Sequence, residues 1–130
     1  MSVINNIAGK NVLLIGGGSG MGRASALALS NEGAKVVIAG RKIEPLEMTA
    51  SLAENPDSIF SQKADVTDRE SIDHLYQWFD KQIGRLDFLV HAAGINVAMR
   101  SMKELSPEEW DKLININLTG TYNVMRLALD

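Results

Sequence analysis

The chain has 130 residues, no cysteine and a formal net charge of −3 at pH 7. This length suits one domain with one core, and the lack of cysteine excludes disulfides and thiolate chemistry. A mildly acidic chain without a basic cluster does not favour nucleic acid or an anionic membrane as its main partner. No apolar run approaches transmembrane length and residues 1–10 lack the apolar core of a signal peptide, so we expect a cytoplasmic protein.

A glycine-rich turn, residues 15–22 (Ile-Gly-Gly-Gly-Ser-Gly-Met-Gly), joins two segments of different pattern. The apolar run 12–15 predicts a strand at 11–15 that is buried on both faces, and the Ala- and Leu-rich run 21–32 predicts a helix. Residues without a Cβ let a phosphate approach backbone N–H groups at a helix start, where the helix dipole favours negative charge. Three of the glycines form G-x-x-x-G-x-G, one residue longer than the usual dinucleotide fingerprint. We therefore predict a phosphate site rather than a merely flexible turn, with the candidate residues Gly16, Gly18, Ser19, Gly20, Met21 and Gly22.

The rest of the chain alternates between strand and helix patterns. Strands are expected at 35–39, 58–63 and 86–91, and helices at 43–54, 67–83 and 106–129. Thr67-x-x-Glu70 and Ser106-Pro107-Glu108-Glu109 are capping patterns that open the last two helices. The apolar stripe of the third helix is expected to pack in the core and comprises Ile72, Leu75, Tyr76, Phe79 and Ile83. The alternation predicts an α/β fold in one domain, residues 1–130: a doubly wound parallel sheet with strand order 3-2-1-4 and helices on both faces.

Five features together resemble the N-terminal half of a short-chain dehydrogenase/reductase, in that family's order and at about its spacing. They are the glycine turn, Gly40-Arg41, Asp65-Val66, Ala93-Gly94, and Asn117 within Ile-Asn-Leu-Thr-Gly. The resemblance implies a Rossmann domain that binds NAD(P), in an oxidoreductase of alcohol or carbonyl substrates. It also implies that Asp65 and Val66 hold the adenine ring, that Ala93 and Gly94 border the cofactor, and that Asn117 distorts its helix and holds a water in a proton relay.

Each of these positions also has an ordinary structural interpretation. Asp65 could be a solvated turn residue, Arg41 a surface arginine, and Asn117 a polar helix residue bonded within its own helix. Arg41 is informative because NAD-binding proteins usually place a carboxylate after the second strand, whereas an arginine can grip a 2′-phosphate with two hydrogen bonds. We therefore expect NADP(H) rather than NAD(H), with NAD still possible. Arg23 is interpreted as an ordinary residue of the first helical turn.

Three departures from the family pattern stand out. Ile15 replaces a threonine whose hydroxyl ties the turn down, and His91-Ala92 replaces Asn-Asn, where we interpret His91 as a structural histidine. The family's chemistry uses a serine and a Tyr-x-x-x-Lys pair that do not occur here. Tyr122-x-x-x-Arg126 has the spacing, but arginine stays charged and cannot share a proton as lysine can. We therefore expect these 130 residues, a truncated module, to bind the nucleotide without running the reaction.

Two other classes of function stay open: a non-catalytic module that binds a dinucleotide or a partner, and a different Rossmann enzyme such as a methyltransferase. The second class usually has an acidic residue after the second strand, which Gly40-Arg41 lacks. No metal-ligand cluster is visible. The fourth strand would be an apolar edge at 88–90, so we expect homo-oligomers or aggregation.

Overall fold

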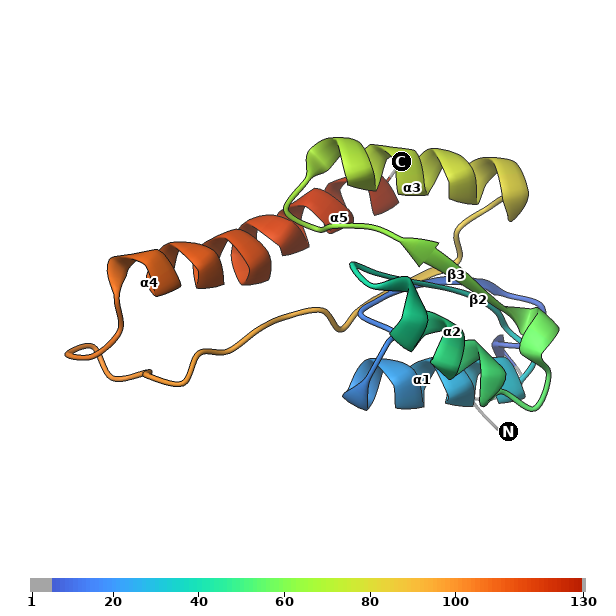
Figure 1. Ribbon diagram of the computed structural model, residues 1–130. Coiled ribbons are helices and arrows are strands. Elements are labelled where there is room, and N and C mark those ends of the chain that lie inside the picture. The colour runs from blue at the N-terminus through green and yellow to red at the C-terminus, as the bar shows by residue number, and fades with distance from the viewer. Residues whose placement is uncertain (1–5, 130) are drawn as a thin grey trace.

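The computed structural model describes residues 6–129 and contains one four-stranded sheet covered by helices on both faces (Figure 1). Its strands are β1 (Asn11–Ile15), β2 (Lys35–Gly40), β3 (Ile59–Lys63) and β4 (Phe88–His91). They lie in the order β3-β2-β1-β4, and every neighbouring pair is parallel. The predicted doubly wound sheet and its strand order are confirmed.

The helices divide between the two faces of the sheet. Figure 1 shows α1 (Gly20–Asn31) and α2 (Ile43–Ser51) on one face, and α3 (Arg69–Gln82) with α5 (Gly120–Ala128) on the other. The short helix η2 (Pro56–Ser58) leads into β3, and α4 (Pro107–Leu113) continues through η3 (Ile114–Thr119) into α5. Helix α4 and the loop before it extend beyond the sheet in Figure 1. None of the helices described between residues 6 and 129 is long and apolar enough to cross a membrane.

The core lies on both sides of β1 and β2, which explains why these strands are apolar without alternation. Leu13 and Ile15 pack in one cluster with residues of α3 and α5, whereas Val12 and Leu14 pack in another with residues of α1 and α2. All four side chains are essentially inaccessible to solvent. The register follows from this double burial, since a shift by one residue would exchange the two faces.

Two helix starts were predicted from capping patterns, and one of the two predictions is wrong. Helix α4 has the expected box, with the Ser106 hydroxyl accepting from the Glu109 N–H and the Glu109 carboxylate accepting from the Ser106 N–H. Helix α3, however, is capped by Asp68, whose carboxylate accepts from the N–H groups of Glu70 and Ser71. Thr67 instead donates to Asp65. Both residues are good caps, so the sequence alone could not decide between them.

The helix expected at 106–129 is not uniform. Residues Ile114–Thr119 form a π-helical segment, η3, between α4 and α5. Asn117 lies inside η3, and its carbonyl accepts a hydrogen bond of 2.5 Å from the Thr121 hydroxyl four residues later. Such a bond from a threonine to the preceding turn is known to bend helices, and π-bulges occur often at functional sites. The distortion implied by the family resemblance is therefore present.

Candidate functional site

A cavity of about 460 Å³ lies at the carboxyl ends of the strands. Its walls come from the segments that follow all four strands, and these segments are distant in sequence but adjacent in the parallel sheet. The strand order reverses between β1 and β4, and ligands of open α/β sheets bind at such a switch point. All of the predicted cofactor-binding residues line this cavity: Gly16, Gly18, Ser19, Gly20, Met21, Gly22, Arg41, Asp65, Val66, Ala93 and Gly94.

The glycines of the turn are required for two different reasons. A Cβ on Gly22 would lie 1.8 Å from the carbonyl oxygen of Gly16, and a Cβ on Gly16 would lie 2.7 Å from the backbone nitrogen of Ala93. These two positions must be bare so that the turn can pack against α1 and the loop after β4. Gly16 and Gly20 both have a positive φ, of +90° and +53°, but Gly20 differs because a Cβ there would meet nothing within 4 Å. The protein itself leaves the space beside Gly20 open.

The start of α1 offers unpaired backbone donors beside that open space. The first N–H groups of any α-helix lack intrahelical acceptors, and the dipole makes this end positive. Among residues 6–129, no side chain caps α1: Ser19 occupies the N-cap position without a capping hydrogen bond, and the first turn has no acidic residue. This end of the helix can therefore accept an anion from outside the chain.

The opposite wall of the cavity is formed by Asp65 and Val66, after β3. The Asp65 carboxylate accepts two hydrogen bonds at Oδ1, from the N–H and the hydroxyl of Thr67, at 2.9 and 2.7 Å. The Asp65 N–H donates to the Ser71 hydroxyl at 2.9 Å. These bonds order the turn, in which Asp65 is half-buried, and adenine binding by Asp65 stays a prediction.

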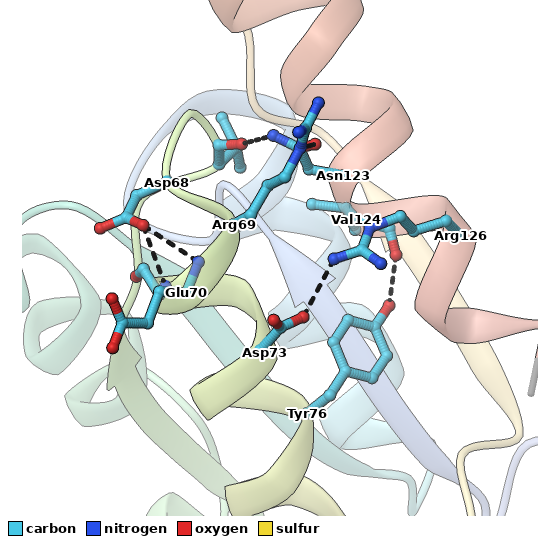
Figure 2. Close-up of polar contacts among 10 residues, drawn as sticks. Asp68, Arg69, Glu70, Asp73, Tyr76, Asn123, Val124 and Arg126 are labelled. Carbon is cyan, nitrogen blue, oxygen red and sulfur yellow. Dashed lines mark hydrogen bonds and ion pairs between the residues drawn. The ribbon is translucent and has the colours of Figure 1, made fainter.

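Helix α5 supports the same wall from behind, through a residue that the sequence analysis missed. Asn123 is 1% exposed, donates to the Val66 carbonyl at 2.8 Å and accepts from Arg69 at 3.1 Å (Figure 2). The Val66 side chain packs over Gly120, where a Cβ would lie 2.6 Å from Val66 Cγ2. An asparagine in a helix has no sequence signal for this role, because its partner is 57 residues away.

Two further contacts join α3 to α5. Figure 2 shows the Tyr76 hydroxyl donating to the Val124 carbonyl at 2.7 Å and Arg126 paired with Asp73 at 3.0 Å. Burial raises the pKa of Tyr76 to about 12. Because Arg126 is engaged with α3 and Tyr122 is exposed, Tyr122 and Arg126 do not act as a pair.

Positive charge gathers at the β2–β3 end of the cavity. Arg41 and Lys42 follow β2, and both are exposed on the cavity wall. Lys63 ends β3 and is paired in register with Gly40. Arg41 and Lys63 also line a smaller adjoining hollow of about 280 Å³. This end of the cavity suits an anionic group on the ligand.

Asn117 holds the loop after β4 rather than projecting into the cavity. Its side-chain amide donates to the Ile95 carbonyl and accepts from the Ile95 N–H, both at 2.9 Å. Ile95 and Gly94 line the cavity, whereas Asn117 does not. A Cβ on Gly94 would lie 3.3 Å from Asn117 Oδ1, so this glycine permits the close approach.

His91 ends β4 and is tied to η3 and α5 through Thr121. Its Nε2 lies 3.0 Å from the Thr121 hydroxyl, and that hydroxyl donates its one proton to the Asn117 carbonyl. Nε2 must therefore carry a hydrogen and donate. Burial lowers the pKa of His91, which keeps the ring neutral at pH 7, and Nδ1 is buried with no partner among the described residues. The geometry agrees with a structural histidine.

In the described part of the chain, no group of three or more His, Cys, Asp or Glu residues could hold a metal ion.

A parallel sheet with an open glycine turn at its switch point defines a Rossmann-type domain. Comparison with known proteins gives the family. The model of the short-chain dehydrogenases matches residues 10–130. An uncharacterised oxidoreductase of Staphylococcus aureus (strain MW2) is 36% identical over 120 residues, which cover 92% of this chain and 51% of the relative. An uncharacterised oxidoreductase of Listeria monocytogenes is 36% identical over 127 residues, covering 95% and 50%.

Solved structures agree with this result. A short-chain dehydrogenase from Bacillus anthracis superposes with a TM-score of 0.85 at 32% identity, covering 97% of this chain and 50% of that one. A 3-ketoacyl-(acyl-carrier-protein) reductase from Brucella melitensis, complexed with NADH, superposes with a TM-score of 0.86 at 30% identity, covering 93% and 49%. The chain belongs to the short-chain dehydrogenase family, as its motifs suggested, and spans about half the length of these relatives. Membership of the short-chain dehydrogenase family excludes the methyltransferase alternative.

Proposed function

We propose that the chain binds a nicotinamide dinucleotide, NADP(H) in preference to NAD(H), as the nucleotide-binding part of an oxidoreductase of alcohols or carbonyls. The pyrophosphate would bind at Gly18–Met21, and the adenosine would lie towards Asp65 and Val66. Ala93 and Gly94 would border the cofactor on the β4 side. One observation carries the proposal: every predicted cofactor-binding residue lines a single cavity at the switch point of the sheet.

The preference for NADP(H) rests on charge. Three basic residues, Arg41, Lys42 and Lys63, surround the end of the cavity where the ribose of the adenosine would lie, and no carboxylate directly follows β2. A carboxylate there would repel a 2′-phosphate, whereas a guanidinium can donate two parallel hydrogen bonds to it. The Brucella structure contains NADH, so both cofactors belong in the test.

A direct test is titration of the purified chain with NADPH and NADH, for wild type and for Arg41→Ser. We expect the substitution to weaken NADPH binding about tenfold or more, the value of a charge-assisted contact, and to leave NADH nearly unchanged. Arg85→Ser is the matched control, because Arg85 is 87% exposed and precedes β4 at the opposite end of the sheet. Tighter binding of NADH than of NADPH by the wild type would contradict the preference, and binding of neither would contradict the site.

Catalysis would divide between the cofactor and the protein. The nicotinamide supplies the hydride, and Asn117, through the family resemblance, would take part in a proton relay. The family's Ser and Tyr-x-x-x-Lys do not occur in these 130 residues. We therefore expect the isolated 130 residues to bind cofactor without turnover, and steady oxidation of NADPH with carbonyl substrates would contradict this.

Self-association of this polypeptide is also proposed. Strand β4 pairs only with β1 among the described strands, and Phe88 on it is 47% exposed. Helix α5 and the residues on either side of it expose Leu118, Tyr122, Met125 and Leu129. An apolar strand with one unpaired edge and an exposed apolar helix face favour association with a second chain. A monomer in light scattering across a wide concentration range would contradict the proposal.

A further inference from the structure

A hydrogen-bond network between α1 and α2 binds the backbone carbonyls of the glycine turn on the side that faces away from the cavity. Arg23 of α1 donates from Nε to the Thr49 hydroxyl at 2.9 Å and from one Nη to the Gly18 carbonyl at 2.6 Å. Thr49 of α2 donates to the Gly17 carbonyl at 2.7 Å. The same Nη lies 3.3 Å from the Pro45 carbonyl. Arg23 and Thr49 together are here called the Arg23–Thr49 brace.

The donors and acceptors of the brace match one another, and Thr49 is shielded from water. The Thr49 hydroxyl accepts from Arg23 and has one proton to donate, and the shorter of its two contacts is the one to Gly17. Thr49 is fully buried, and Arg23 is half-buried. Neither residue lines the cavity, so a direct contact with a bound ligand is not their role. The guanidinium is held by protein carbonyls.

The brace fixes the direction of two peptide groups. A peptide bond is planar and trans, so a carbonyl and the following N–H point in opposite directions. Thr49 of α2 holds the Gly17 carbonyl and Arg23 of α1 holds the Gly18 carbonyl, so both carbonyls point into the seam between the two helices and the N–H groups of Gly18 and Ser19 point away from it. Gly18 and Ser19 both line the cavity on that other side. Ile15 has no hydroxyl that could bind the turn. The side-chain hydrogen bonds that hold the turn come instead from Arg23 of α1 and Thr49 of α2.

We propose that Arg23 and Thr49 are positioning residues for dinucleotide binding, which orient the Gly18 and Ser19 amides towards the pyrophosphate by holding the carbonyls of Gly17 and Gly18. This inference rests on the proposed function, because it names what orients the phosphate-binding amides. The brace acts on the pyrophosphate, which NADH and NADPH share. It is therefore separable from Arg41, whose effect is expected on NADPH alone.

The test uses four variants of the chain, titrated with NADH and NADPH. Thr49→Val removes the hydroxyl at nearly constant shape, Thr49→Ser keeps it, Arg23→Lys keeps the charge without the guanidinium fork, and Arg85→Lys is the matched control. We expect Thr49→Val and Arg23→Lys to weaken both cofactors by the same factor, about five- to tenfold, while Thr49→Ser and Arg85→Lys bind like wild type. Wild-type affinity of Thr49→Val and Arg23→Lys would overturn the proposal. So would a loss confined to NADPH, which would mean that Arg23 acts by its charge on the 2′-phosphate.

A second measurement is independent of cofactor binding. The backbone amide resonances of Gly18 and Ser19 in the free protein should move in Thr49→Val, whereas those of Asp65 and Val66 on the far wall should stay in place. Unmoved Gly18 and Ser19 resonances would refute the brace. If the wild type bound neither cofactor but these two resonances moved as expected, the proposed function would fail while the orientation of the turn by Arg23 and Thr49 would stand.

Discussion

Replacement of Gly20 by alanine tests whether the open space at the turn is a binding site. Gly20 has a φ of +53°, and a Cβ there meets no protein atom within 4 Å. The substitution therefore adds no clash, and its cost to folding is the backbone strain of an L-residue in the left-handed region, about 1–2 kcal/mol. For a domain of this size, that corresponds to a fall in melting temperature of roughly 4–7 °C.

The effect on ligand binding should be larger than the strain alone explains. A methyl group beside the first N–H groups of α1 would keep a phosphate from approaching them. Loss of one charge-assisted hydrogen bond costs about 1.5–3 kcal/mol, which is a tenfold or greater loss of affinity. We expect Gly20→Ala to bind NADPH and NADH at least about tenfold more weakly than the wild type.

Gly9 provides a matched control for the strain. Its φ is +75°, and a Cβ there also meets nothing within 4 Å, but Gly9 lies before β1 at the amino ends of the strands. Gly9→Ala should lower the melting temperature by a similar amount and leave cofactor affinity unchanged. Cofactor titration and thermal unfolding of both variants decide the matter. Wild-type affinity in folded Gly20→Ala, or an equal loss of affinity in Gly9→Ala, would refute the reasoning.

Three other predictions concern the supports of the site. Tyr76→Phe removes the 2.7 Å hydrogen bond to the Val124 carbonyl and should cost about 1–2 kcal/mol in urea unfolding, and an unchanged midpoint would contradict it. Burial lowers the pKa of His91 below its usual 6.5, so the unfolded chain takes up this proton at a higher pH than the folded chain. Stability should therefore fall as the pH drops below about 6.5, and by less in His91→Gln than in the wild type; equal losses would show that other groups are responsible. Asn117→Leu removes both bonds to Ile95 and should speed hydrogen exchange of the Ile95 amide, whereas unchanged protection would show that other contacts hold the loop.

The sheet could be predicted from the sequence because its signals are local and strong. The apolar runs at 12–15 and 36–39 are buried on both faces, and double burial removes the alternation that other strands show. The fourth strand is shorter than predicted: β4 begins at Phe88, whereas the sequence predicted a start at residue 86. Asp87, just before it, accepts from the Asn11 N–H and so continues the contact with β1 through its side chain.

The supports of the site could not be predicted, because each depends on a partner far away in the sequence. Arg23 looks like any residue of a first helical turn, and its partner Thr49 is 26 residues away. Asn123 is unfavourable in a helix by propensity, yet nothing in the sequence distinguishes it from an exposed asparagine. The π-helical segment around Asn117 likewise has no periodic signal, and only the family resemblance pointed to a distortion there.

Both walls of the cavity are organised in the same way. The residues that line the cavity form the sequence motifs, and the residues that hold them in place lie elsewhere in the chain. On each wall the main chain lines the cavity, and a side chain from a neighbouring helix holds a carbonyl from behind: Thr49 holds Gly17, and Asn123 holds Val66. On the β1 wall the main chain lines the cavity because side chains are absent, so those positions are visible as a glycine motif, whereas the other wall is visible in the sequence as Asp65-Val66. The supporting side chains need only reach one carbonyl, and several residue types on several turns of a helix could do so. The motif therefore identifies where a ligand can approach, while the direction of the binding groups is set by residues that carry no motif.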